Sequence, residues 1–98
     1  MIVVFADDTL ALIETDQAAR TRLSVALIKS ARRKLTLLRA APDERSLRNW
    51  KSLHYEKLKG DREGQRSIRL NDQFRLVFTF NDETSPRTII VVGIEDYH

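Results

Sequence analysis

The chain has 98 residues, of which 42% are apolar and 32% are charged. This composition argues against disorder, and the length fits one domain spanning residues 1–98. Because the chain has no cysteine, disulfides, zinc–thiolate sites and thiol catalysis are excluded. The first residues lack the basic start of a signal peptide and no apolar run could cross a bilayer, so we expect a cytoplasmic protein.

The net charge is +3, and the charges are unevenly distributed. Residues 17–42 carry seven bases and no acid, and residues 45–75 carry nine bases and four acids, whereas both ends are acidic. A basic middle suits a polyanion such as nucleic acid, or an acidic protein partner. A solvated surface gives the same pattern, so charge alone leaves these alternatives open.

The first half of the chain predicts one strand and two helices. The β-branched run 2–5 predicts the strand, and capping oxygens at 7–9 predict a short helix over 10–13. A second cap at Thr15 and Asp16 predicts a long helix to about Ala41, which Pro42 ends.

The long helix is predicted to be amphipathic. One side carries an apolar stripe of Leu23, Leu27, Ala31, Leu35 and Leu38. The opposite side carries the bases Arg22, Lys29, Arg32, Arg33 and Arg39. These bases form either a solvated face or a grip on RNA phosphates.

The second half predicts strands after a polar connector with one helical turn. The strand runs are 55–59, 65–70, 74–80 and 88–94. The last run is apolar on both faces, so it should lie inside the sheet. Tight turns make neighbouring strands antiparallel. We therefore predict an α+β layout: a mainly antiparallel sheet of four to five strands with two N-terminal helices packed on one face.

The register of the predicted 65–80 hairpin follows from its alternation. For the apolar faces of both strands to meet, Arg69 must lie directly opposite Arg75 on the other face. Like charges so placed repel each other, which makes sense if an anion lies between them. Alternatively, both side chains point into water, or a carboxylate such as Asp61 or Asp96 neutralises them.

The chain ends in Asp96, Tyr97 and His98, directly after the most apolar strand. Histidine is the side chain best suited to move a proton near neutral pH. A terminal histidine is often a frayed end, but a strand here fixes its approach. His54 lacks such support and is interpreted as structural or surface. No metal-site motif and no phosphate-binding glycine loop is evident.

These groups suit RNA cleavage without a metal. A base takes the proton of the 2′-hydroxyl, cations stabilise the charge on the phosphorane, and an acid protonates the leaving 5′-oxygen. His98, Arg69, Arg75 and Lys59 could fill these roles.

Three motifs resemble the HigB toxins, the plasmid-maintenance killer proteins of the RelE/ParE superfamily. They are Leu-Lys-Gly-Asp-Arg-Glu-Gly at 58–64, Ser-Ile-Arg-Leu-Asn-Asp-Gln-Phe-Arg at 67–75 and the Asp-Tyr-His end. The resemblance covers about residues 56–98, and the helical half matches in layout only. It implies a RelE-like fold and cleavage of mRNA in the ribosomal A site, with no cofactor.

The resemblance assigns the family's functional positions to Lys59, Arg69, Arg75, Asp96, Tyr97 and His98. The catalytic candidates are Lys59, Arg69, Arg75, Asp96 and His98. The predicted RNA contacts are Lys57, Arg62, Arg66, Asn71 and Tyr97, of which Tyr97 would stack on a base. Phe74 stands where family members often carry tyrosine or tryptophan.

The expected partners are a HigA-type helix-turn-helix antitoxin, the ribosome and mRNA, with operator DNA contacted only through the antitoxin. Two other functions remain open at this point. One is a non-catalytic domain that binds RNA or the ribosome and blocks translation. The other is a plain interaction module whose basic helix binds an acidic partner.

Overall fold

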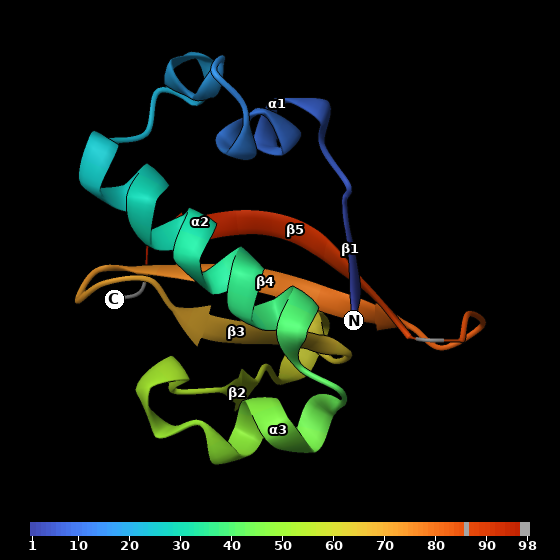
Figure 1. Ribbon diagram of the computed structural model, residues 1–98. Coiled ribbons are helices and arrows are strands. Elements are labelled where there is room, and N and C mark those ends of the chain that lie inside the picture. Colours follow the sequence, from blue (N-terminus) through green and yellow to red (C-terminus); the bar gives the residue numbers. More distant parts are fainter. Residues whose placement is uncertain (86, 97–98) are drawn as a thin grey trace.

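The computed structural model describes residues 1–85 and 87–96, which form a mixed sheet and a set of helices (Figure 1). The strands are β1 (Ile2–Phe5), β2 (Glu56–Lys57), β3 (Gln65–Arg69), β4 (Phe74–Asn81) and β5 (Thr88–Asp96). The α-helices are α1 (Asp8–Ala11), α2 (Val25–Ala40) and α3 (Glu44–Asn49). Short 3-10 turns are η1 (Leu12–Glu14), η2 (Ala18–Thr21), η3 (Lys51–Leu53) and η4 (Gly60–Arg62). The α+β class is confirmed.

The long helix begins later than predicted. Thr15 closes only a local turn, because its hydroxyl accepts from the Gln17 amide at 3.0 Å. Arg22 then adopts the left-handed conformation at φ 64°, which interrupts the helical path. Ser24 is the actual cap, and its hydroxyl accepts from the Leu27 amide at 3.1 Å. The predicted start near residue 15 was therefore wrong, whereas the end before Pro42 is confirmed.

The strand order is β1-β5-β4-β3-β2. β5 lies between β1 and β4, so its predicted interior position is confirmed. The pairing of β1 with β5 is parallel, whereas the other three pairs are antiparallel. In the β3–β4 hairpin Ile68 pairs with Leu76 and Arg69 with Arg75, which confirms the register predicted from alternation.

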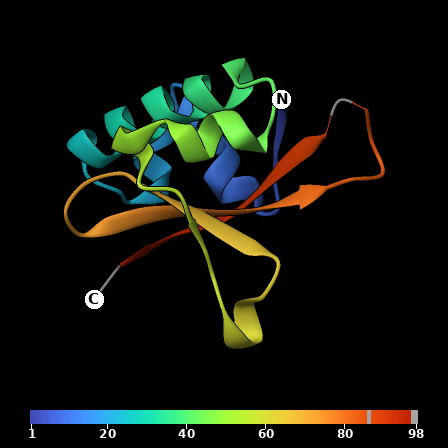
Figure 2. The ribbon, with the colours of Figure 1, turned by 90° about the horizontal axis from the view of Figure 1, so that it is seen from below.

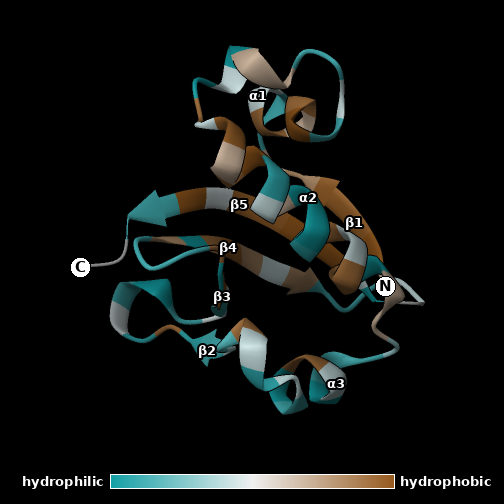
Figure 3. Ribbon diagram, turned by 60° about the vertical axis from the view of Figure 1, so that its left-hand side comes forward, coloured by the Kyte–Doolittle hydropathy of each residue, from teal (hydrophilic) through white to brown (hydrophobic). Residues whose placement is uncertain are grey.

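The helices cover one face of the sheet and leave the other open (Figure 2). Under the helices lies an apolar core, and the hydropathy colouring shows apolar segments on α2, β4 and β5 (Figure 3). Its fully buried members include Leu35, Leu38, Ile68, Leu76, Phe78, Ile89 and Val91. None of the helices in the described part of the chain has the length and apolar character needed to cross a bilayer.

Glu44, in the first turn of α3, attaches that helix to the sheet. Its carboxylate accepts from the Tyr55 hydroxyl and lies 3.5 Å from Arg66 and 3.5 Å from Arg87. Both guanidiniums also lie over the Phe80 ring. Burial alone would raise the pKa of Glu44, but the Tyr55 hydrogen bond and the nearby arginines bring it below its usual value.

Replacing this carboxylate should destabilise the fold in a pH-dependent way. We expect Glu44→Gln to lower the free energy of unfolding by about 1–3 kcal/mol at neutral pH, because hydrogen bonds to charged groups contribute that much. The folded-state pKa of Glu44 lies below the unfolded value, so this contribution is present above the unfolded pKa and is lost as the pH falls through the folded pKa. Urea denaturation across the acid range measures the difference.

The matched control is Asp82→Asn, which removes an exposed carboxylate from the same Arg87. Exposed ion pairs contribute little, so the control should change stability by less than about 1 kcal/mol. Equal losses in the two variants, or a Glu44→Gln loss that persists in acid, would contradict the role given to Glu44.

Candidate functional site

The open face of the sheet carries a groove made of two adjoining hollows. The first, of about 230 Å³, is lined by Leu58, Arg62, Ser67, Arg75, Val77, Glu95 and Asp96. The second, of about 340 Å³, is lined by His54, Arg69, Asn71, Asp72 and Arg75. Arg75 lines both hollows and therefore marks the centre of the groove.

Arg75 lies on β4, the middle strand, and only 8% of the residue is exposed. Its Nε donates to the Ser67 hydroxyl at 2.8 Å, and its Nη2 donates to the His54 carbonyl and to the Ser67 carbonyl. The Glu56 carboxylate lies 3.9 Å from Nη2. A buried cation needs such partners, and together they hold the guanidinium in one orientation.

Arg69 lies opposite Arg75 but is held separately. It pairs with the Asp72 carboxylate, and its Nε donates to the Asn71 carbonyl at 3.3 Å. Each guanidinium of the like-charged pair thus has a carboxylate partner, Asp72 for Arg69 and Glu56 for Arg75. A carboxylate at this site was one of the predicted alternatives, but neither of these two was named.

The turn between β3 and β4 depends on Asn71. Its Oδ1 accepts from the amides of Gln73 and Phe74 at 2.8 and 2.7 Å, which closes a local side-chain turn. Gln73 in turn donates from Nε2 to Asp96 at 2.9 Å. Asn71 therefore shapes the turn, and the turn brings the end of β5 to the edge of the groove.

Arg62 enters the groove from the η4 turn and binds Glu95. Glu95 pairs with Arg75 across β4 and β5, and both of its oxygens accept from Arg62. The Arg62 hydrogen bond lowers the pKa of the Glu95 carboxyl. The predicted RNA contact Arg62 thus lies in the groove with its charge already paired.

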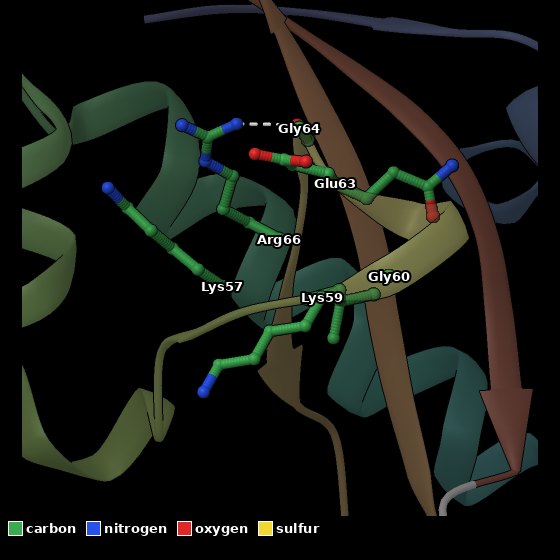
Figure 4. A pocket seen from close by; sticks show the side chains of 8 residues that line it. Lys57, Lys59, Gly60, Glu63, Gly64 and Arg66 are labelled. Atoms are coloured by element: carbon green, nitrogen blue, oxygen red, sulfur yellow. Dashed lines mark hydrogen bonds between the residues drawn. The ribbon is translucent and has the colours of Figure 1, made fainter.

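The remaining described basic candidates lie outside the groove. Lys57, Lys59 and Arg66 line a separate hollow of about 580 Å³ at the β2–β3 turn (Figure 4). Arg66 also pairs with Glu44 and lies on the helix-covered side, since it has the parity of Ile68. The structure therefore brings together Arg62, Arg69, Asn71, Arg75 and Asp96. Tyr97 and His98 lie outside the described residues.

Several groove residues were not predicted from the sequence. His54 contributes its main-chain carbonyl and has left-handed backbone at φ 49°, features that no side-chain pattern reveals. Ser67 could have been found, because it shares the face of Arg69 by strand alternation. Within residues 1–85 and 87–96, no cluster of three or more histidines and acids is placed to hold a metal.

The fold is similar to that of several solved toxin structures. The YoeB/ParE toxin from Agrobacterium tumefaciens is 17% identical, with all of both chains covered and a TM-score of 0.62. YafQ from E. coli strain BL21(DE3) is 12% identical over 96% of this chain and 90% of that chain, with a TM-score of 0.66. The YoeB-YefM complex from Staphylococcus aureus is 20% identical over 100% and 97%, with a TM-score of 0.57.

The particular family follows from the sequence. The family of the RelE-like toxin of type II toxin-antitoxin system HigB matches residues 3–97, so the chain belongs to this family. The resemblance drawn from the hairpin and the turn is thereby confirmed, and it extends over the helical half. Curated proteins give no significant match.

The Ser67 hydroxyl should be needed to hold Arg75. Ser67→Ala removes the acceptor of the buried Nε, and an unsatisfied buried donor costs about 1–3 kcal/mol. Urea denaturation should show that loss, whereas Ser52→Ala, at an exposed serine, should leave stability unchanged. A Ser67→Ala protein as stable as the wild type would show that the guanidinium is held by other groups.

Proposed function

We propose that this chain is the toxin of a type II toxin-antitoxin system that inhibits translation by cleaving mRNA in the ribosomal A site without a metal ion. The observation that carries the proposal is the Arg75 guanidinium, fixed by Ser67 and His54 at the centre of an open groove. Membership of the HigB-like toxin family supports it. In the reaction, a ribose 2′-oxygen bonds to the neighbouring phosphorus and the P–O5′ bond breaks, which leaves a 2′,3′-cyclic phosphate and a 5′-hydroxyl end.

The proposed chemistry uses groups that converge on one phosphate. Arg75 and Arg69 bind the phosphate oxygens and stabilise the charge that develops on the phosphorane. His98, two residues after the groove residue Asp96 in the sequence, is assigned the proton transfer, in which a proton leaves the attacking 2′-hydroxyl and a proton is added to the departing 5′-oxygen. Asp96 orients His98, and Tyr97 stacks on a base.

Lys59 has a different part in the proposal. It is exposed in the hollow beside the β2–β3 turn, so it contacts the RNA backbone next to the groove. Lys57 shares that surface. Arg62 contributes a further positive charge inside the groove when Glu95 is displaced.

A second candidate is a translation inhibitor that binds RNA or the ribosome without cutting it. It is favoured by the pairing of Arg62, Arg69 and Arg75 with carboxylates, an arrangement that permits anion exchange and requires no proton transfer. The two candidates differ in whether cellular transcripts acquire new 5′ ends.

The proposed partner is a HigA-type antitoxin with a DNA-binding helix-turn-helix. The Staphylococcus aureus neighbour is a YoeB-YefM toxin-antitoxin complex, which supports a protein partner of the antitoxin class. Operator DNA would be contacted through that antitoxin.

Loss of the proposed catalytic groups should abolish toxicity. We expect His98→Ala and Arg75→Lys to prevent growth arrest on induction, because each such group contributes factors of about 10² to 10⁴. Mapping 5′ ends of cellular mRNA during induction measures cleavage. Arg20→Ala, at an exposed arginine of η2, is the control and should cut like the wild type.

Thermal unfolding of each purified variant separates loss of chemistry from loss of fold. A folded His98→Ala protein that still cuts transcripts would overturn the catalytic assignment. Growth arrest by the wild type with intact transcripts would favour inhibition by occupancy.

The antitoxin should be encoded beside this chain. We expect the product of an adjacent reading frame with a helix-turn-helix to restore growth when both are induced, and to elute with the toxin as one species on size exclusion. Independent elution together with continued arrest would contradict the proposed pairing.

A further inference from the structure

One flank of α2 lies against the turn of the β3–β4 hairpin. The buried Ser30 hydroxyl donates to the Leu70 carbonyl at 2.6 Å, and Leu70 directly follows Arg69. Lys34 lies one helical turn beyond Ser30 on the same side of the helix. The hairpin turn lies beside the first half of α2 in the view from below (Figure 2). This contact brings the flank of α2 that carries Lys34 to the hairpin turn that follows Arg69, and the two cations lie close enough for their charges to interact.

The charges on this flank are unbalanced. Arg33 is exposed and Lys34 is half-exposed, and within residues 1–85 and 87–96 neither forms an ion pair. Burial lowers the pKa of Lys34, and the charges of Arg33 and Arg69 lower it further. Asp72 is paired with Arg69 and is 94% exposed, so it neutralises little of this cluster.

The other flank of the same helix differs. Arg32 donates to the Ile13 carbonyl at 2.6 Å, and Arg39 binds Glu14. Those two bases therefore fasten the N-terminal segment to α2 and have a structural role. Among the described residues of α2, Arg33 and Lys34 on the hairpin side therefore differ from Arg32 and Arg39, whose guanidiniums already have protein partners.

We propose that Arg33 and Lys34, together with Arg69, form a shoulder that binds the phosphate backbone of the single-stranded RNA substrate beyond the cut site. The proposal rests on the proposed function and extends the RNA-binding surface from the groove, past the hairpin turn, to one flank of α2. The cations of this surface are adjacent and repel one another until an anion neutralises them. The surface therefore suits contacts to RNA phosphates that do not depend on base sequence.

The test measures binding of uncleavable RNA to the full-length protein. A dinucleotide and a twelve-nucleotide strand, both with 2′-O-methyl riboses, are titrated by fluorescence anisotropy at several salt concentrations. For the Arg33→Gln/Lys34→Gln double variant, the slope of log affinity against log salt should become shallower by about 1.4 for the long strand, since each phosphate contact contributes about 0.7. Dinucleotide affinity should change less than twofold.

Arg20→Gln is the matched control, because it removes an exposed charge from η2, which packs on η1 and α1. It should leave both affinities and the slope unchanged. A double variant that binds the long strand like the wild type would overturn the shoulder. That result is expected if this flank of α2 binds an acidic protein and not RNA. The shoulder would also be overturned if the double variant lost equal affinity for the dinucleotide and the twelve-nucleotide strand, or if binding by the wild type did not depend on salt.

This outcome is distinguishable from failure of the proposed function. If His98→Ala still cuts transcripts while the slope falls as expected, the shoulder stands and the catalytic assignment fails. If the wild type cuts transcripts, His98→Ala does not, and the salt slope of the double variant equals that of the wild type, the catalytic assignment stands and the shoulder fails.

Discussion

The structure depends on one buried guanidinium. Arg75 sits on the middle strand of the sheet, and its partners are Ser67 on β3 and the His54 carbonyl just before β2. A buried cation that loses such partners is strongly destabilised, so the strands must assemble around it. The centre of the groove and the packing of one half of the sheet are therefore formed by the same contacts, and the site exists only when the fold is complete.

Features that depend on local alternation could be predicted from the sequence. The parity of the apolar residues fixed the hairpin register and hence the Arg69–Arg75 pair, because a slip of one residue would expose the core face. The start of α2 could not be predicted, since Thr15 and Ser24 both offer capping oxygens. The choice is made by tertiary contacts such as that of Arg32 with the Ile13 carbonyl. The parallel β1–β5 pair joins the two ends of the chain, which no local pattern specifies.

The sequence predicted the cations of the candidate site and the carboxylate of Asp96, but not the other carboxylates. Motif and register gave Arg69 and Arg75, whereas Glu56 and Glu95 reach the groove only because β2 and β5 take particular places in the strand order. For Arg66, the sequence already contained evidence against the predicted role. Its parity with Ile68 already placed it toward the helices, where it binds Glu44, so the register argument conflicted with its assignment as an RNA contact.

The arginines of the groove already have carboxylate partners, and this affects how the groove can bind an anion. Arg62, Arg69 and Arg75 each have a carboxylate partner, so under the proposed function an incoming phosphate competes with these carboxylates as well as with water. Such an exchange yields little net free energy per contact, because the released carboxylate and the bound phosphate offer similar oxygen geometry. In compensation, Arg75 is already held in one orientation, so the proposed reaction would need little reorganisation of this side chain. Under the proposed function, a weakly binding but preorganised groove fits an enzyme whose substrate strand is held in place by the ribosome.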